Sequence, residues 1–347
     1  MKRIGILTSG GDCPGLNAAI RGVAKASYQL FDDIEIVGIL EGYKGLIDMH
    51  YRVMNKDEFS DILTLGGTIL KTSRRKEASV RKNSDNIYKV MAKNYKKMGL
   101  DCLVIIGGDG THKAATKLVE HGLNIIGLPK TIDNDIWGTD VTFGYQSAVN
   151  IATDVIDRVH TTAASHSRVL IVELMGNTAG WLTLSAGIAG GADVILLPEI
   201  PYHIGAVADT INKRYERGKH FSIIAVAEGA TNVLDPDQIL KGQHYSIGYK
   251  LADELTNEID IDTRVVVPGH YQRGGAPCPF DRVLATQMGV HATELISKGK
   301  FGRTVAVKDG VITSNLIKKI AGKTKIIPPD APLLDSGRRI GINFGEA

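Results

Sequence analysis

The stretch DCLVIIGGDGTHKAATKLVEHGLNIIGLP, residues 101–129, decides the fold. An apolar run ends in two glycines, a segment with helical spacing follows and stops at Gly122, and a second apolar run begins at once. Glycine is common just beyond a helix end. Continuous Val/Ile/Leu runs are expected of strands in a parallel sheet covered on both faces. The stretch therefore predicts a strand, a helix and a second, parallel strand.

The same alternation extends along the rest of the chain. A helix is predicted from about Asn17, between the apolar runs RIGILTS and IEIVGIL. Later apolar runs predict further strands, and a long amphipathic helix is predicted near the end: RVLIVEL, ADVILLPE, FSIIAVAEG and TRVVVPG, then DRVLATQMGVHATELISKG. We predict two α/β domains, each a mostly parallel sheet flanked by helices, with a soft boundary near residues 143–148.

The composition excludes several classes of protein. The chain has 347 residues, of which 43% are hydrophobic and 23% charged, and its formal net charge is only +3, which argues against a nucleic-acid surface. The three cysteines, Cys13, Cys102 and Cys278, have no CxxC spacing, which excludes a disulfide framework and a thiolate zinc site and fits a reducing cytosol. No run of about 18 apolar residues is present. The N-terminus enters a strand without a leader-like segment. We expect a cytoplasmic protein without membrane or nucleic-acid partners.

Two glycine-rich loops follow predicted strands and open predicted helices. TSGGD, residues 8–12, is suited to cradle a phosphate, because glycines let backbone N–H groups approach an anion at a helix N-terminus; a tight turn without a ligand is the alternative. GGDGT, residues 107–111, adds the carboxylate of Asp109. An acid beside bound phosphates is repulsive unless a divalent cation lies between them, and Mg²⁺ binds through one or two carboxylates plus phosphates. The second loop therefore indicates phosphoryl transfer.

A third motif, TIDND, residues 131–135, follows the next strand. Its two carboxylates, Asp133 and Asp135, can divide the work: one takes the proton from an attacking hydroxyl and the other helps to hold the metal. A structural Asx-turn is the alternative interpretation.

Taken together, these motifs resemble the 6-phosphofructokinase family. The resemblance rests on TSGGDCPGLNAAIRG, GGTILKTSR, GGDGT and PKTIDND, and continues through SHSRVLIVELMG, GWLTLSAGIAGGADVILLPE, AVAEGA and PGHYQRGGAPCPFDR. It covers nearly the whole chain in order. The resemblance implies two Rossmann-like three-layer α/β domains with mostly parallel sheets and an active site in the cleft between them. It also implies Mg²⁺-dependent transfer of a phosphoryl group to the 1-hydroxyl of fructose 6-phosphate, a step of glycolysis.

The resemblance also implies roles for individual residues. Asp133 corresponds to the catalytic base, and Asp109 with Asp135 to the Mg²⁺ site. The expected donor-binding residues are Gly11, Tyr43, Arg74, Gly108, Asp109, Gly110 and Thr111, with Arg74 also contacting the transferring phosphate. The expected sugar-phosphate residues are Thr131, Asp133, Arg168, Met175, Gly176, Glu228, Arg264, His270 and Arg273. Guanidinium groups suit the 6-phosphate because they fork onto phosphate oxygens.

The resemblance also implies how the chain divides into two domains and that it forms a homo-oligomer. Residues 1–144 with about 272–322 would form the phosphoryl-donor domain, and residues 145–271 with about 323–347 the sugar-phosphate domain. In the family, arginines at the positions of Arg168 and Arg264 reach into a neighbouring subunit's site. We therefore expect a homodimer or homotetramer with shared active sites.

Two residues disagree about the phosphoryl donor. Pyrophosphate enzymes of the family typically carry Asp where this chain has Gly110, and its charge fills the space that an ATP α-phosphate needs. They also carry Lys at the position of Lys130, where ATP enzymes of the bacterial allosteric type have Gly. This mixture resembles the mixed-donor branch of the family. We give Gly110 more weight and expect ATP, with pyrophosphate as the alternative, and the aromatic ring of Tyr43 supports a nucleotide.

One departure from the family pattern concerns catalysis. Asn177 stands where arginine is usual, and we expect the ammonium group of Lys130 to supply the missing charge as a catalytic group. A non-catalytic regulatory paralogue of the same fold remains an alternative that Asn177 favours and the retained acids oppose. A GGDGT kinase of another acceptor is a third, which the second-half sugar-phosphate residues oppose. The effector site of the family is only partly intact in this chain. Its basic residues Arg21, Lys25, Arg217 and Lys219 are present, but His160 replaces an arginine, so we expect weak regulation.

Overall fold

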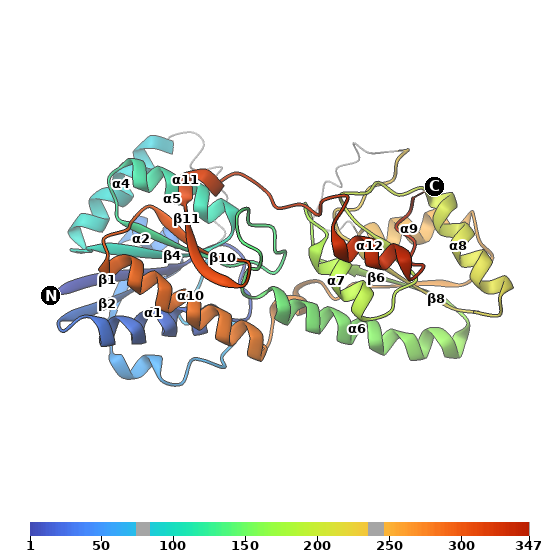
Figure 1. Ribbon diagram of the computed structural model, residues 1–347, viewed down its shortest axis with the longest axis horizontal. Coiled ribbons are helices and arrows are strands. Elements are labelled where there is room, and N and C mark those ends of the chain that lie inside the picture. Colours follow the sequence, from blue (N-terminus) through green and yellow to red (C-terminus); the bar gives the residue numbers. More distant parts are fainter. Residues whose placement is uncertain (74–83, 235–245, 347) are drawn as a thin grey trace. The chain divides into compact units, whose positions relative to one another are not determined.

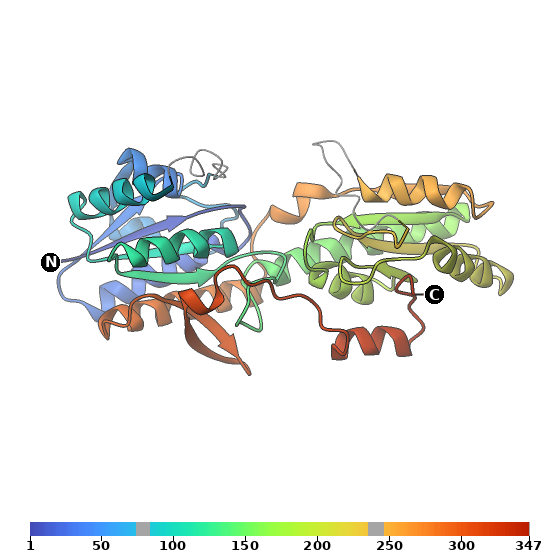
Figure 2. The same cartoon turned by 90° about the horizontal axis from the view of Figure 1, so that it is seen from above.

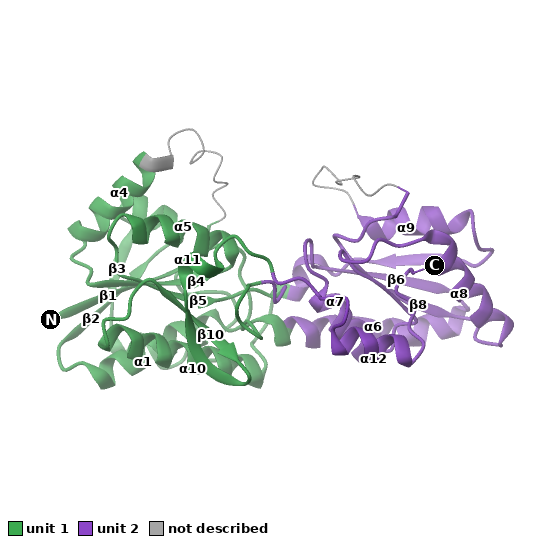
Figure 3. Cartoon of the chain, turned by 45° about the horizontal axis from the view of Figure 1, so that its top comes forward, with its two compact units in different colours: residues 1–132, 136–147, 273–324 green, residues 133–135, 148–272, 325–347 purple. Residues whose placement is uncertain are grey.

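The computed structural model describes residues 1–73, 84–234 and 246–346, which form two compact units (Figure 3). Unit 1 comprises residues 1–132, 136–147 and 273–324, and unit 2 comprises residues 133–135, 148–272 and 325–347. The chain therefore leaves unit 1 after Ser147, builds most of unit 2, and returns at Arg273 to finish unit 1.

Unit 1 is built on a seven-stranded sheet in its described residues, in the order β11-β10-β5-β4-β1-β2-β3. Its strands are β1 (Lys2–Thr8), β2 (Ile34–Ile39), β3 (Tyr51–Met54), β4 (Cys102–Gly107), β5 (Ile125–Pro129), β10 (Arg303–Lys308) and β11 (Val311–Leu316). The central strands are parallel, whereas β3 and β11 run antiparallel to their neighbours at the two edges. Figure 2 shows the β10–β11 hairpin at one edge of this unit.

Helices cover both faces of this sheet. One face carries α2 (Tyr43–Asp48), α4 (Ser84–Lys97), α5 (Asp109–Glu120) and α11 (Ile317–Ile320), whose apolar side chains share a core with the strands. The other face carries α1 (Leu16–Leu30) and α10 (Pro279–Ser297), which lie side by side (Figure 1). Gly22 and Gly289 make their close approach possible, because a Cβ on Gly22 would lie 2.8 Å from the Thr286 carbonyl oxygen. The short η1 (Lys56–Phe59) follows β3.

Unit 2 has a four-stranded, wholly parallel sheet in its described residues, in the order β7-β8-β6-β9. The strands are β6 (Val169–Leu174), β7 (Val194–Leu196), β8 (Ser222–Ala227) and β9 (Thr263–Val266). The helices are α6 (Tyr145–His166), whose first residues belong to unit 1, α7 (Trp181–Ala189), α8 (Ile204–Glu216), α9 (Ile247–Thr256) and α12 (Pro332–Arg339). Apolar residues of α8 and α9 form a core with one face of the strands, and η2 (Gly269–Arg273) follows β9.

These elements confirm the predicted fold class, an α/β chain with two mostly parallel sheets flanked by helices. The helix predicted from Asn17 begins at Leu16, and the long helix predicted near the end spans Pro279–Ser297. The antiparallel edge strands β3 and β11 were not predicted, because they lack the continuous apolar pattern of the buried strands. The short strand β10, which lies between β11 and β5, was not predicted either. In the described part of the chain, no helix combines the length and hydrophobicity that crossing a bilayer requires.

Candidate active site

The two glycine-rich loops lie side by side at the point where the order of the unit 1 sheet reverses. β2 pairs with one side of β1 and β4 with the other, so the loops after β1 and β4 leave neighbouring carboxyl ends. Ligands of open α/β sheets bind at such a switch point. The backbone N–H of Ser9 donates to the Ile106 carbonyl at 3.0 Å, and the Thr111 hydroxyl donates to the Ser9 carbonyl at 3.5 Å. The two motifs therefore form one backbone surface.

The first loop is held by side chains that bond its carbonyl groups. Gly10 has φ 85°, a left-handed conformation that glycine adopts without strain. Its carbonyl accepts a hydrogen bond from the Thr72 hydroxyl at 2.7 Å, and the Gly11 carbonyl accepts one from the Lys130 ammonium. Lys130 is only 3% exposed, so it brings a buried positive charge to the loop. The structure thus brings two predicted residues, Gly11 and Lys130, together.

The second loop forms the N-terminus of α5, with Gly108 before the helix and Asp109 as its first residue. The Tyr43 hydroxyl donates to the Thr111 carbonyl at 2.9 Å, which fixes the aromatic side chain against the first turn. Burial raises the pKa of Tyr43, so the phenol keeps its proton. Gly110 is exposed, its φ is not positive, and a Cβ placed on it would meet nothing within 4 Å. Neither backbone geometry nor packing requires glycine at this position.

Asp109 and Asp135 were predicted to hold Mg²⁺. The Asp109 carboxylate pairs with Lys113 at 2.7 Å and accepts a hydrogen bond from the Gly322 N–H at 2.7 Å. Asp135 lies in the segment 133–135, which groups with unit 2, and its carbonyl accepts from the Lys325 N–H at 2.8 Å. Within the described ranges, no three His, Cys, Asp or Glu side chains gather closely enough to hold a metal. The arrangement fits a cation bound by a single carboxylate together with phosphate oxygens, and not one caged by protein ligands.

The loop that carries the predicted base follows β5. Lys130 pairs with Phe143 in a short bridge, and the Thr142 hydroxyl donates to the Thr131 carbonyl at 2.8 Å, so this loop is folded back onto residues 142–143. Asn134 has φ 52°, a left-handed turn that Asn tolerates better than most residues. Asp133 is half-buried beside it.

In unit 2, three predicted sugar-site residues meet at the carboxyl ends of β6 and β8. Met175 and Gly176 follow β6, and Glu228 follows β8. The Gly176 N–H donates to a Glu228 carboxylate oxygen at 3.4 Å, and the Glu228 N–H donates to the Leu174 carbonyl at 2.9 Å. The Met175 N–H donates to the side chain of Gln272, which is fully buried, at 3.3 Å.

The predicted phosphate-gripping residues fall into separate places. Arg168, just before β6, and Arg264, in β9, both pair with the carboxylate of Asp262, the first at 2.6 Å. His270 and Arg273 share η2, where His270 is exposed. A guanidinium nitrogen of Arg273 donates to the Asp12 carbonyl of the first glycine loop at 3.2 Å. Arg74 lies outside the described residues.

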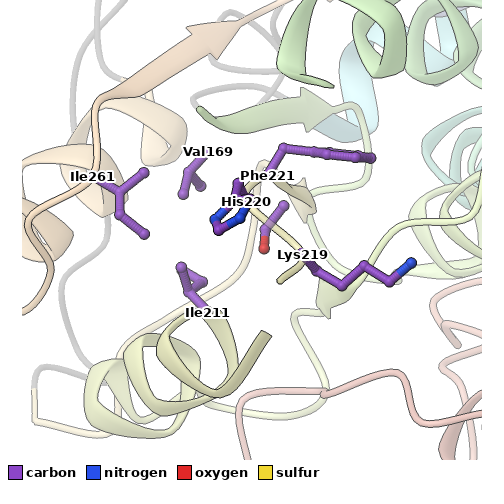
Figure 4. Close-up of a pocket in the computed structure, with 7 residues that line it drawn as sticks. Val169, Ile211, Lys219, His220, Phe221 and Ile261 are labelled. Carbon is purple, nitrogen blue, oxygen red and sulfur yellow. The ribbon is translucent and has the colours of Figure 1, made fainter. Parts of the chain in front are cut away.

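Two further regions are the cysteine that follows the first glycine loop and the predicted effector region. Burial raises the pKa of the Cys13 thiol to about 12, so the group stays protonated and serves packing. In the predicted effector region, Lys219 lines a hollow with Ile211, Ile261 and His220 that leaves no room for a water molecule. Figure 4 shows the Lys219 side chain leading away from Val169 and Ile261. His160 Nε2 donates a 2.6 Å hydrogen bond to the Gly190 carbonyl oxygen.

Several residues that support the site through other residues were not predicted from the sequence. They are His112, which bonds the Gly108 carbonyl, Thr72, which bonds Gly10, Asp262, which joins two arginines, and Gln272. A histidine, threonine or glutamine beside a recognised motif carries no periodic signal. Asp262, two residues before Arg264 in β9, carried a charge pattern that could have been noticed.

The geometry defines a class of protein: a two-unit α/β chain whose first sheet carries paired glycine loops at its switch point, an arrangement typical of sites for phosphate compounds. Comparisons agree. The family model for phosphofructokinase matches residues 3–296. A relative from Spirochaeta thermophila, named ATP-dependent 6-phosphofructokinase, is 49% identical over 99% of this chain and 98% of its own length. ATP-dependent 6-phosphofructokinase 3 of Bacteroides thetaiotaomicron is also 49% identical, over 99% of this chain and 100% of its own.

Among solved structures, phosphofructokinase of Pichia pastoris in the T-state superimposes with a TM-score of 0.82 at 33% identity. The match covers 92% of this chain and 35% of the Pichia chain, so this chain spans about a third of that longer relative. This chain belongs to the phosphofructokinase family.

Proposed function

We propose that this chain is an ATP-dependent 6-phosphofructokinase, which transfers the terminal phosphoryl group of ATP to the 1-hydroxyl of fructose 6-phosphate. The products are ADP and fructose 1,6-bisphosphate. The observation that carries the proposal is the pair of glycine loops at the switch point of unit 1, in a chain that is 49% identical to two ATP-dependent 6-phosphofructokinases. The free thiols of Cys13, Cys102 and Cys278 support a reducing, cytoplasmic setting.

ATP binds along the glycine loops in this proposal. The backbone N–H groups of the first turn of α5 face the phosphates, and the helix dipole adds partial positive charge there. Gly11, Gly108 and Thr111 belong to this surface, Tyr43 flanks it, and Arg74 is expected to contact the transferring phosphate. The open space at Gly110 supports ATP, because among the described residues no atom lies within 4 Å of a Cβ placed there, and glycine adds no charge that would repel a further phosphate group.

Mg²⁺ is the cofactor that this chemistry requires. Asp109 would hold it together with donor phosphate oxygens, and Asp135 would contribute from its loop. To do so, the Asp109 carboxylate exchanges its contacts with Lys113 and the Gly322 N–H for the cation. When bound, the ion neutralises charge that builds up on the phosphates during transfer.

Asp133 acts as the general base. It takes the proton of the sugar's 1-hydroxyl as that oxygen forms a bond to the terminal phosphorus and the bond between phosphorus and the bridging oxygen breaks. Lys130 supplies positive charge at the first loop, where its ammonium already bonds the Gly11 carbonyl. It thereby compensates for Asn177, which stands where the family usually has arginine.

The sugar phosphate is recognised by residues of the second half. Thr131, Met175, Gly176 and Glu228 contact the sugar, and arginines grip the 6-phosphate. Arg168 and Arg264 serve the site of a neighbouring copy, while His270 and Arg273 serve their own. The enzyme therefore works as a homodimer or homotetramer, and the exposed position of Arg264 supports this arrangement.

Pyrophosphate is the second candidate donor, which the buried Lys130 favours. An assay coupled to fructose 1,6-bisphosphate formation, run in parallel with ATP and with pyrophosphate, separates the two. We expect a higher kcat/KM with ATP. Activity with pyrophosphate alone would contradict the donor assignment, and no turnover with either donor would support the regulatory paralogue. Asp133→Asn should lower kcat by ~10²-fold or more, as removal of a general base does.

A further inference from the structure

His112 lies in the second turn of α5, behind the GGDGT loop, and its side chain is completely buried. Both ring nitrogens have partners. Nδ1 is 2.8 Å from the Gly108 carbonyl oxygen, and Nε2 is 2.9 Å from the hydroxyl of Thr304, in β10. The ring therefore connects the phosphate-facing loop to a strand that comes from nearly two hundred residues further along the chain.

The partners determine which nitrogen carries the proton. A carbonyl oxygen can only accept, so Nδ1 must carry the hydrogen that it donates to Gly108. In a neutral imidazole Nε2 is then the acceptor, and the Thr304 hydroxyl donates to it. Burial lowers the pKa of His112, which favours this neutral ring. The network leaves one tautomer that satisfies all three groups.

The absence of a side chain at Gly127 leaves space for the His112–Thr304 hydrogen bond. A Cβ on Gly127, in β5, would lie 2.8 Å from the Thr304 hydroxyl oxygen and 2.9 Å from His112 Nε2. Any side chain there would force the two groups apart. Gly127 has an ordinary φ, so its glycine is explained by this space and not by backbone conformation.

The bond to Gly108 has a consequence for the loop. In a trans peptide the C=O and N–H groups point in opposite directions. The Gly108 carbonyl accepts from the backbone N–H groups of Thr111 and His112, at 3.0 and 3.1 Å, and the His112 ring adds a third and shorter bond from the same side. With the carbonyl held toward the helix, the N–H of Asp109 is turned outward, to the side where α5 presents its first N–H groups.

We propose that His112, in its Nδ1–H form and braced by Thr304, is a positioning residue that orients the Gly108–Asp109 peptide toward the donor phosphates. The inference rests on the proposed function, since it concerns how that site binds its donor. His112 contacts no substrate itself. It acts through Gly108, and it should affect the donor and not the sugar phosphate.

Two nearly isosteric variants separate the two bonds. His112→Asn keeps an amide N–H at the level of Nδ1, where it can bond Gly108, and His112→Gln places its amide at the level of Nε2, where it can bond only Thr304. We expect His112→Gln to lower kcat/KM for ATP about tenfold or more, mainly through KM, as loss of a buried hydrogen bond predicts. His112→Asn should stay within about threefold of the wild type. KM for fructose 6-phosphate should not change in either, and His121→Gln, at the other end of α5, is the matched control.

A spectroscopic readout accompanies the kinetics. Nitrogen-15 NMR of the wild type should show a protonated Nδ1 and an unprotonated Nε2 on this buried ring. The inference is overturned if the ring carries its proton on Nε2, or if the two variants show the same ATP kinetics. A wild type without phosphotransfer would refute the proposed function instead. In that case the NMR tautomer and the binding affinity for ATP would decide the inference. We would still expect His112→Gln to bind ATP more weakly than His112→Asn.

Discussion

Replacing Gly110 by Asp tests the assignment of the donor. The structure predicts that this variant keeps its folding stability but loses activity with ATP. Gly110 is exposed in the first turn of α5, and its φ is compatible with any residue. A side chain there meets nothing within 4 Å of its Cβ. The Gly110→Asp variant should therefore fold without strain.

The variant should even be slightly more stable. Exchanging glycine for aspartate in a helix gains only about 0.3 kcal/mol, because Asp is itself a poor helix former, and a carboxylate near a helix N-terminus adds about 0.3–1 kcal/mol. Repulsion from the neighbouring Asp109 offsets part of this, so we expect a gain of about 1 kcal/mol or less in the free energy of unfolding. Chemical denaturation of the unliganded protein measures it.

Activity with ATP should fall at the same time. A carboxylate about 5 Å from one phosphate charge, at an effective dielectric constant of about 20, is disfavoured by about 3 kcal/mol. This corresponds to roughly a hundredfold loss of kcat/KM for ATP. Pyrophosphate has no third phosphate group, so its use should be spared, and the ratio of the two donors should shift toward pyrophosphate.

Gly110→Asn is the matched control, since it has the size of Asp without the charge. It should lose less ATP activity than Gly110→Asp, and the difference between the two variants measures the electrostatic part. Coupled assays with both donors at saturating fructose 6-phosphate provide the comparison. A folded Gly110→Asp protein that keeps the wild-type kcat/KM for ATP would refute the reasoning that Gly110 leaves room for a nucleotide.

Three further predictions concern assembly, pH and packing. If Arg264 serves a neighbouring copy, mixing inactive Arg264→Ala protein with inactive Asp133→Asn protein and allowing subunits to exchange should restore activity; a mixture as inactive as its parts would argue against shared sites. Asp281 is fully buried, its carboxylate accepts bonds from the N–H and hydroxyl of Ser147 at 2.7 and 2.6 Å, and burial raises its pKa above the usual range of an aspartate. Its stabilising contribution is therefore full below the pKa of the unfolded chain and is lost as pH rises through the raised folded pKa. The stability advantage of the wild type over Asp281→Asn should accordingly shrink as pH rises from acid toward neutral; denaturation curves with a pH-independent gap would contradict this. Gly289→Ala should lower stability by about 1–3 kcal/mol, because its Cβ would lie 2.7 Å from the Val23 nitrogen, whereas the control Gly205→Ala, with nothing within 4 Å, should not, as thermal or chemical unfolding will show.

The parts of the fold that were predictable are those with a periodic or punctuated signal. Buried parallel strands such as Cys102–Gly107 read as continuous apolar runs, and the helix from Leu16 to Leu30 shows a buried face. The edge strands β3 and β11 were not recognised, because their half-exposed residues follow neither pattern. Their place is decided by pairing with β2 and β10, which a single sequence does not reveal.

The same division holds for the site. Gly11, Lys130 and Thr111 were found because they belong to recognisable motifs, and in unit 1 Lys130 bonds Gly11 while Thr111 bonds Ser9 of the same loop. His112 was missed, although it lies one residue beyond the GGDGT motif, because its importance depends on Thr304 and Gly127. Contacts between residues this far apart in the chain arise only from the topology of the sheet.

The route of the chain affects the order in which the protein is completed during synthesis. The first sheet receives β10 only after residue 308 has emerged and β11 only after residue 316, and until β10 pairs with it β5 presents an uncovered edge. The second sheet is completed later still, because the bridge between Asn343 and Val194 at its β7 edge forms only after residue 343 has emerged. A nascent chain that stalls or is cut before its final thirty or so residues would leave both units unfinished, and it should be a ready target for chaperones and proteases.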